Sequence, residues 1–371
     1  MTEPQSAPDD AFPDAERLDW LRLARTETVG PVAFQHLIGR FGSARAALQA
    51  LPHLARRAGR ALPPAICSPA EAEAEMAEGE RRGGALICAA EPAFPAALKA
   101  LDPPPPLIWA LGEAALLQRR TVAIVGARVA SAAGCRFARG LAGELGEAGL
   151  AVASGLARGV DAAAHEGSLP TGTIAVLGGG IADIYPPENA ALYRAVAQRG
   201  CVVSESPPTH RAQARDFPRR NRLISGLSLA VVVVEAELKS GSLITARLAA
   251  EQGREVLAVP GSPLDPRARG CNDLIRQGAA VCEGAEDVLR AIEQIRGFSA
   301  PPQAEFDFDQ AGETPTELIE RVFALLSPTP APIDELARQA GAPAGQVFAA
   351  LVELSLAGRA ELLDGGMAAR G

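Results

Sequence analysis

The middle of the chain alternates between short, continuous apolar runs and longer segments in which apolar residues recur at helical spacing. The runs are rich in β-branched residues and occupy residues 121–125, 150–153, 173–177, 201–203, 229–234 and 256–259. Strands that are apolar at successive positions are buried on both faces of a parallel sheet, and parallel strands need a crossover, usually a helix, between them. The pattern predicts an α/β protein with an extended Rossmann-type parallel sheet over residues 86–296, whose ligands bind beyond the carboxyl ends of the strands.

A small helical domain is expected ahead of this sheet, over residues 17–85. Apolar residues recur at helical spacing on both sides of a break at residues 29–31. This layout is like that of a SAM-type or helix-hairpin-helix module, although the second glycine of the usual hairpin is missing. Residues 1–16, which are acidic and contain proline, are expected to be a disordered tail. The four prolines at residues 103–106 predict a stiff polyproline II spacer between the SAM-like domain and the sheet.

A winged-helix domain is expected at residues 315–371, after an acidic, proline-containing linker at residues 297–314. The pattern of apolar residues and glycines predicts three helices and a turn, at residues 318–325, 333–340, 343–357 and 364–366 respectively.

The third of these helices lacks the side chains of a DNA-reading helix. In duplex-binding modules of this shape the third helix enters the major groove and carries basic or amide side chains. Here the helix contains Gln346 and Glu353 but no Lys or Arg. We expect this domain not to bind duplex DNA strongly, and the apolar side chains around Val347, Phe348 and Leu351 to pack internally or against a protein partner.

The formal net charge of -8, from 36 Lys and Arg against 44 Asp and Glu, argues at first against a polyanionic partner. The charge is unevenly distributed, because residues 119–296 carry 21 basic against 18 acidic side chains. The densest basic run in this stretch consists of Arg211, Arg215, Arg219, Arg220 and Arg222. Such a run is often only a solvated face, so a role in binding needs support from the loops around it.

Several other classes of protein are disfavoured. The 6 cysteines lack the paired spacing of a zinc site, so we expect reduced thiols and no metal. The sequence shows neither a signal-like leader nor an uninterrupted apolar run of about 20 residues, so we expect a cytoplasmic protein without a membrane segment. The G-x-x-x-x-G-K-[ST] phosphate loop is missing and spacing assigns no Ser, His and Asp arrangement, so we expect neither catalysis nor a cofactor.

The loop after the first parallel strand reads Gly126-Ala127-Arg128. A dinucleotide fingerprint would place G-x-G-x-x-G here, so that a pyrophosphate could approach the backbone. A guanidinium at a helix N-terminus can instead bind phosphate oxygens by two hydrogen bonds, together with the helix dipole. Arg128 is therefore a candidate phosphate ligand, and a structural ion pair is the alternative.

The loops after the next two strands are rich in glycine. The first ends in Asp161, a residue that can cap the helix that follows. His165 in that helix has no evident Cys or His partner, which favours a buried, hydrogen-bonded histidine over a metal ligand or a base. The second loop contains glycines at 178–180, and the amides around Gly179 could form a nest for an anion.

Two basic loops are expected at the same carboxyl edge, at residues 217–222 and 239–242. The first combines guanidinium groups and an amide with an aromatic ring, a mixture suited to phosphates and stacked bases. The second precedes an apolar helical segment, of which Ser242 would be the N-cap. The candidate DNA-binding residues of these loops are Arg220, Asn221, Arg222, Lys239, Ser240, Gly241 and Ser242.

In their order along the chain these motifs resemble DNA-processing protein A, the DprA or Smf family. The likeness covers about residues 90–290, and the flanking modules match many family members. The residues that carry it are Gly126-x-Arg128, Ser154-Gly155, Asp161, His165, Tyr185-Pro186, Asn189, Ser204-Glu205, Arg220-Asn221-Arg222, Glu235, Ser240-Gly241-Ser242 and Pro260-Gly261.

The resemblance implies an extended Rossmann fold, homodimers, and cooperative binding of single-stranded DNA. It also implies that the protein protects incoming strands and loads RecA recombinase during natural transformation and recombination. The arginine of the family's G-x-R motif matches Arg128, and the basic position before Ser-Gly-Ser matches Lys239. Arg220 and Arg222 are assigned from their own chemistry and not from the family.

Two other classes of function remain as alternatives. One is a nucleotide-processing Rossmann enzyme of the phosphoribohydrolase type, which has similar glycine-rich loops. Such enzymes carry a P-G-G-x-G-T-x-x-E pattern, and Pro260-Gly261-Ser262 does not continue in that way. The other is an adaptor that binds no small ligand or nucleic acid.

Overall fold

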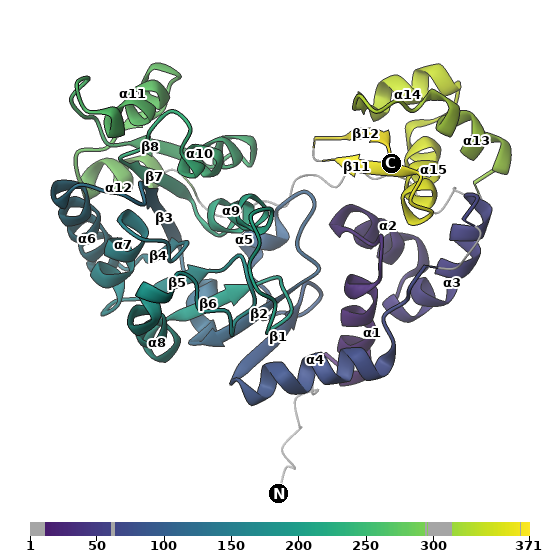
Figure 1. Ribbon diagram of the computed structural model, residues 1–371, viewed down its shortest axis with the longest axis horizontal. Helices are drawn as coiled ribbons and strands as arrows, with labels where there is room; N and C mark the ends of the chain where they lie inside the picture. The colour runs from purple at the N-terminus through teal and green to yellow at the C-terminus, as the bar shows by residue number, and fades with distance from the viewer. Residues whose placement is uncertain (1–11, 61–63, 294, 296–313, 364) are drawn as a thin grey trace, which may run out of the picture. The chain divides into compact units, whose positions relative to one another are not determined.

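The computed structural model describes residues 12–60, 64–293, 295, 314–363 and 365–371 (Figure 1). Contacts divide the chain into two units, Glu75–Pro301 and a second formed by Met1–Ala74 together with Pro302–Gly371. The predicted linker, except for Thr314, and most of the predicted tail lie outside the described residues. The described end of that tail already belongs to a helix, which begins at Asp14.

In the described residues of Glu75–Pro301 there is a nine-stranded sheet with the order β1-β2-β6-β5-β4-β3-β7-β8-β9. The predicted apolar runs correspond to β3 (Thr121–Gly126), β4 (Ala151–Ser154), β5 (Thr173–Val176), β6 (Cys201–Ser204), β7 (Ala230–Val234) and β8 (Glu255–Ala258). All of these pair in parallel with their neighbours in this group. The Rossmann-type fold is therefore confirmed.

The apolar pattern does not predict the strands at the two edges. β1 (Gly84–Cys88) and β2 (Leu107–Gly112) are antiparallel to each other, and β2 is antiparallel to β6. At the other edge β9 (Ala280–Val281) pairs in parallel with β8. The prolines at 103–106 lie inside the sheet unit, just before β2. They therefore do not form the predicted spacer between the helical domain and the sheet. Their segment is tied to the sheet, since the Ala89 amide donates to the Pro106 carbonyl at 2.9 Å.

Helices cover both faces of the parallel strands (Figure 1). One face is covered by α6 (Ala132–Glu147), α7 (Val160–Ser168) and α12 (Ala285–Glu293). The other is covered by α5 (Ala96–Lys99), α9 (Asp216–Leu227), α10 (Gly241–Glu251) and α11 (Arg269–Arg276). Val122 and Ile124 of β3 belong to the first core, whereas Ala123 and Val125 belong to the second. Because each face of β3 is buried, its sequence is apolar at every position.

The remaining elements of the sheet unit are α8 (Ala190–Arg199) and the 3-10 helices η1 (Ala114–Gln118), η2 (Pro187–Asn189) and η3 (Pro266–Ala268). The helix α4 (Pro69–Arg81) contains the boundary between the two units, which falls after Ala74. Across the described part of the whole chain, no helix combines the length and the apolar character needed to span a membrane.

The strand order reverses at β3. From β3 the chain runs outward through β4, β5 and β6, and then returns to place β7 and β8 on the opposite side of β3. The connections that leave β3 and β7 therefore diverge, and in open α/β sheets this divergence creates the crevice in which ligands bind. Arg128 follows β3 and Lys239 follows β7, so both candidate residues start from this position.

His165 is a buried structural residue. Its Nδ1 lies 2.7 Å from the Thr173 hydroxyl, and its side chain is not accessible to solvent. Burial, with a smaller contribution from the positive charge of Arg220, lowers the pKa of His165 to about 3. The interpretation of His165 as a buried, hydrogen-bonded histidine is therefore confirmed.

The second unit combines the N-terminal helices with the C-terminal winged helix. Its elements are α1 (Asp14–Arg25), α2 (Pro31–Phe41), α3 (Ala44–Arg57), α13 (Thr316–Leu325), α14 (Ile333–Ala340), α15 (Ala344–Leu356), β10 (Ala331–Pro332), β11 (Ala360–Leu363) and β12 (Met367–Arg370). The strands form a sheet in the order β10-β12-β11. The winged-helix fold is confirmed, although Asp364 of the predicted turn lies outside the described residues.

The third helix of the winged helix, α15, packs between two cores of this unit. Val347 and Leu351 belong to the core of the winged helix itself. Phe348 packs against the core of α1, α2 and α3, to which Val352 and Leu356 belong. The apolar side chains of this helix thus pack internally, which was one of the two alternatives that the sequence left open.

A buried carboxylate fixes α15 to the N-terminal helices. Glu353 is only 1% exposed. Its Oε1 lies 3.2 Å from Nη1 of Arg40, and its Oε2 lies 3.8 Å from Nε of Arg57. The one acidic residue of this helix therefore serves an intramolecular contact.

We expect Glu353→Ala to weaken the packing of α15 by about 3 kcal/mol, because it leaves two largely buried guanidinium groups without their anion. Hydrogen exchange of the α15 amides should then accelerate by roughly a hundredfold. The matched control is Glu361→Ala on β11, where the side chain is exposed and a small effect is expected. Equal exchange in both variants would show that the Glu353 ion pairs do not hold α15.

The stability of the second unit should also depend on the protonation of His36. The ring of His36 packs edge-on against Phe348, with centroids 5.4 Å apart, and burial and the charge of Arg40 lower the His36 pKa to about 4. The unfolded chain binds this proton near pH 6.5, whereas the folded chain binds it only near pH 4. The free energy of unfolding is therefore unaffected by His36 above pH 6.5 and falls as the pH drops from 6.5 toward 4. The loss is expected to approach about 3 kcal/mol. It should be measured by urea unfolding followed by the fluorescence of Trp20, and should be absent in His36→Gln but retained in His53→Gln.

Candidate nucleic-acid interface

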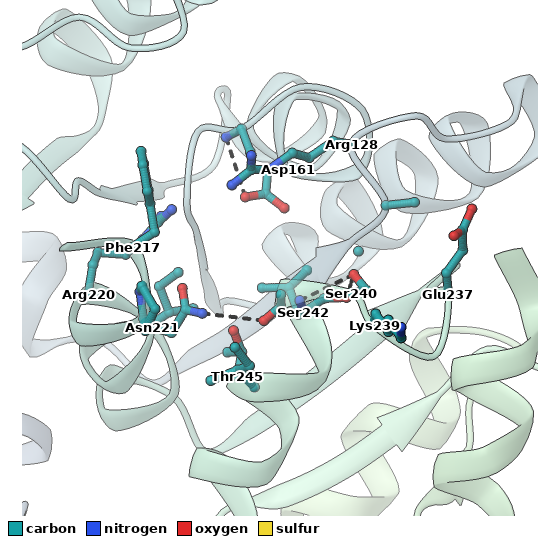
Figure 2. Close-up of a pocket in the computed structure, with 18 of the residues that line it drawn as sticks. Arg128, Asp161, Phe217, Arg220, Asn221, Glu237, Lys239, Ser240, Ser242 and Thr245 are labelled. Atoms are coloured by element: carbon teal, nitrogen blue, oxygen red, sulfur yellow. Dashed lines mark hydrogen bonds between the residues drawn. The ribbon is translucent and has the colours of Figure 1, made fainter. Parts of the chain in front are cut away.

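A pocket of 470 Å³ opens at the carboxyl edge where β3 and β7 meet. Three segments form its walls: the turn after β3, the first half of α9, and the connection from β7 into α10 (Figure 2). Ala157, Asp161 of α7 and Arg267 of η3 also line the pocket. The pocket therefore lies in the crevice that the reversal of strand order creates.

The structure brings most of the predicted site residues into this one pocket. Those that line it are Gly126, Arg128, Arg220, Asn221, Lys239, Ser240, Gly241 and Ser242. They come from segments far apart in the sequence, because β3 and β7 are neighbours in the sheet but not along the chain.

The glycine at the end of β3 is required by close packing. A Cβ atom on Gly126 would lie 1.9 Å from the Val234 carbonyl oxygen and 2.7 Å from Cγ2 of Val160. Any side chain here would push β3 away from β7 and from α7. Gly126 thus allows the two strand ends to approach, and Arg128 follows it at the rim as an exposed residue.

The start of α10 forms the opposite wall. Its N-cap is Ser240 and not Ser242 as predicted, because the Ser240 hydroxyl accepts a hydrogen bond from the Ser242 amide at 3.3 Å. The hydroxyl groups of these two serines lie 2.7 Å apart. Lys239 is exposed directly before the cap, and the first turn of α10 contains no acidic residue. A neutral cap beside a lysine leaves the positive end of the helix dipole available to an anion.

Arg220 lies on a helix and not on a loop, contrary to the prediction. It is 7% exposed, and its Nη1 donates a hydrogen bond to the Val176 carbonyl at 2.7 Å. Burial lowers the Arg220 pKa to about 10, although the charge of Asp161 opposes this shift, so the guanidinium keeps its charge at neutral pH. Among the described residues its Nε has no hydrogen-bond partner. Arg220 therefore supplies a fixed positive charge at the base of the pocket.

Asp161 holds the loop before α7 and does not cap that helix, contrary to the prediction. The N-cap is Gly159, whereas the Asp161 carboxylate accepts from the amides of Gly155 at 3.1 Å and Ala157 at 3.4 Å. Burial raises the Asp161 pKa, while the charge of Arg220 and these two amides act in the opposite direction. The Asp161 side chain thus fixes the backbone of the loop that precedes α7.

Two of the predicted residues do not reach the pocket. Arg222 forms an ion pair with Glu205, and its Nη1 donates to the Pro103 carbonyl at 3.4 Å. Gly179 is buried, and its carbonyl accepts a hydrogen bond from the Ser204 hydroxyl at 2.6 Å. A Cβ on Gly179 would lie 2.2 Å from a carboxylate oxygen of Asp183, so this glycine leaves room for that side chain.

An aromatic pair lies beside the cationic residues. The guanidinium carbon of Arg128 is 5.6 Å from the centre of the Phe217 ring, and that ring is 5.6 Å from the ring of Tyr185 at an interplanar angle of 44°. Tyr185 is 50% exposed. Flat rings next to phosphate-binding cations are the arrangement on which nucleobases stack in single-strand binding proteins.

The basic run before and within α9 extends this surface. Arg211, Arg215 and Arg219 are exposed. In the part of the chain that the structure describes, none of them lies within 4.0 Å of a carboxylate oxygen. Sequence reasoning did not single out Glu237 and Arg267, which also line the pocket. Their positions follow from the fold around β7, and no motif indicates them.

Comparison with known proteins identifies the class to which this fold and site belong, the DNA recombination-mediator proteins. The family model of DNA recombination-mediator protein A matches residues 85–293. Models of the DprA-like N-terminal HHH domain and of the DprA winged helix domain match residues 14–77 and 306–366. The chain belongs to the DprA/Smf family. The N-terminal match names the helix-hairpin-helix module, one of the two modules that its sequence pattern resembles.

Curated relatives extend over most of the chain. Protein Smf of Escherichia coli K12 is 39% identical over 285 residues, which are 76% of this chain and 76% of the relative. DNA processing protein DprA of Bacillus subtilis is 44% identical over 202 residues, which are 54% of this chain and 68% of the relative.

Solved structures give the same result. DprA from Streptococcus pneumoniae is 30% identical with a TM-score of 0.62, and the match covers 75% of this chain and 96% of that protein. DprA from Helicobacter pylori, described for its single-stranded DNA binding mode, is 30% identical with a TM-score of 0.52. That match covers 57% of this chain and 95% of the Helicobacter protein.

We expect Arg222→Ala to destabilise the sheet unit by about 2 kcal/mol, because it removes the guanidinium that pairs with the half-buried Glu205. Urea unfolding of the full chain measures this loss. Arg247→Ala on α10 is the control, since Arg247 is exposed and its pair with Glu251 is open to solvent. Equal stability of the two variants would mean that Arg222 has no structural role.

Proposed function

We propose that this chain binds single-stranded DNA in the pocket between β3 and β7. The observation that carries the proposal is the convergence of Arg128, Arg220 and Lys239 with the ring of Phe217 in one crevice. Three cations around a helix N-terminus suit a phosphate, and the neighbouring ring suits a base. A relative that is 30% identical is described as binding single-stranded DNA, which supports the assignment.

The strand would be held in two ways. Lys239 and the first turn of α10 bind one phosphate from one side, and Arg128 binds it from the other, while the buried Arg220 contributes its field from below. The adjoining base then stacks on Phe217 and Tyr185. Further phosphates contact the exposed Arg215 and its neighbours in the basic run. Such binding does not depend on base sequence, because phosphates and ring faces are common to all nucleotides.

Membership of the family supports a proposal for the biological role. We propose that the protein acts as a homodimer in the cytoplasm, protects incoming single strands and loads a RecA-type recombinase on them during transformation and recombination. This role requires no catalysis. The nucleotide-processing alternative is tested by incubating the protein with a nucleoside monophosphate, which an enzyme of that type would consume.

We expect Arg128→Ala and Lys239→Ala each to weaken binding of a fluorescent single-stranded oligonucleotide. Each should also reduce the slope of log affinity against log salt by roughly one phosphate contact, or about 0.7. The measurement is an anisotropy titration of the full chain at several salt concentrations, with a duplex of the same sequence in parallel.

Arg247→Ala serves again as the control, because it removes an exposed arginine of α10 that does not line the pocket. It should leave the salt slope nearly unchanged. If Arg128→Ala and Lys239→Ala behave like the control, the pocket is not where the strand binds. Tighter binding of the duplex would contradict the preference for single strands.

A further inference from the structure

The first turn of α6 already holds a carboxylate from the chain itself. Glu235, the residue after β7, accepts a hydrogen bond from the Ser131 amide at 2.8 Å and another from the Ser131 hydroxyl. Ser131 is the N-cap of α6, and its hydroxyl also accepts from the Gly134 amide at 2.9 Å. The Glu235 carboxylate therefore lies at the positive end of the α6 dipole, where an anion is stabilised.

The surrounding backbone is adapted to this carboxylate. A Cβ atom on Gly134 would lie 2.6 Å from Cδ of Glu235, so the glycine leaves the space that the carboxylate fills. Glu235 itself has a φ of 53°, in the left-handed region that a non-glycine residue adopts at a cost of about 1 kcal/mol. The hydrogen bonds to Ser131 offset this cost.

The position matters because of what binds there in related folds. In dinucleotide-binding Rossmann domains the pyrophosphate lies at the N-terminus of the helix that follows the first parallel strand. In this chain that strand is β3 and that helix is α6. Here the Ser131 donors are already engaged, and a second anion would meet the negative charge of Glu235.

We propose that Glu235 is a specificity-determining residue that excludes pyrophosphate-containing ligands, such as dinucleotides and nucleoside diphosphates, from α6. The start of α10, with its neutral Ser240 cap and the preceding Lys239, is then the helix end at which this crevice accepts phosphate. The binding of phosphate at the start of α10 rests on the proposed function. The exclusion at α6 concerns a different helix and is tested separately.

The test uses the full chain with glycine-selective ¹⁵N labelling, because each helix end carries its own glycine. Gly134 reports on α6 and Gly241 reports on α10. Inorganic pyrophosphate is titrated into the natural protein, Glu235→Gln and Glu235→Gly. We expect the Gly134 signal to stay in place in the natural protein and to shift in Glu235→Gly. The affinity for pyrophosphate derived from this signal should be at least about tenfold higher in Glu235→Gly than in the natural protein. Glycine adopts the required φ without strain.

Glu235→Gln should give an intermediate response, because the amide keeps an acceptor for Ser131 but lacks the charge. If Glu235→Gly does not fold, the comparison of Glu235→Gln with the natural protein decides on the same criterion. Equal Gly134 responses in the natural protein and the folded Glu235 variants overturn the proposal.

Glu237→Gln is the matched control for net charge, since Glu237 lines the pocket but forms no contact with α6 among the described hydrogen bonds. A Gly134 shift in Glu237→Gln as large as that in Glu235→Gln would also overturn the proposal, because it would trace the effect to charge alone. The Gly241 signal is read independently. Its failure to respond in any of the proteins counts against the phosphate site at α10 and leaves the Gly134 comparison intact.

Discussion

The parallel pairing of β3 with β7 is the contact on which the rest of the site depends. Val122 to Gly126 pair with Ala230 to Val234, so the two strands end side by side. Gly126 has no Cβ to hold the ends apart. Because the sheet order reverses here, the chain leaves the two strands in different directions and the space between them stays open. Arg128 and Lys239 line the same pocket because each follows one of these two neighbouring strands.

Charge in this protein is organised locally. The chain is acidic as a whole, yet four basic side chains line the pocket: Arg128, Arg220, Lys239 and Arg267. Arg220 is buried, and the hydrogen bond from its Nη1 to the Val176 carbonyl fixes the position of its guanidinium group. Asp161 also lines the pocket, where its side chain accepts hydrogen bonds from two backbone amides of the loop before α7. A negative net charge is therefore compatible with binding a polyanion at this site.

The winged helix packs against the N-terminal helices through its third helix, α15. The third helix of this fold can read DNA when it is exposed and basic. Here α15 contributes to two cores and carries the buried Glu353, to which Arg40 and Arg57 are directed. The helix thus joins the first and last segments of the sequence into one unit. The presence of Glu353 in this helix is explained by its ion pairs with Arg40 and Arg57.

The sequence alone determined the elements and the chemistry available to them. Continuous apolar runs predicted the parallel strands because burial on both faces leaves no polar position, and helical spacing predicted the winged helix because each helix buries one stripe. Only the tertiary structure decided which polar residues work together. Arg220 and Arg222 are two positions apart, yet one faces the pocket and the other pairs with Glu205, since helical residues at that spacing point in different directions. Likewise the cation-π contact of Arg128 with Phe217, and the hydrogen bonds of the Glu235 carboxylate at the start of α6, join residues far apart in the sequence, which no local pattern encodes.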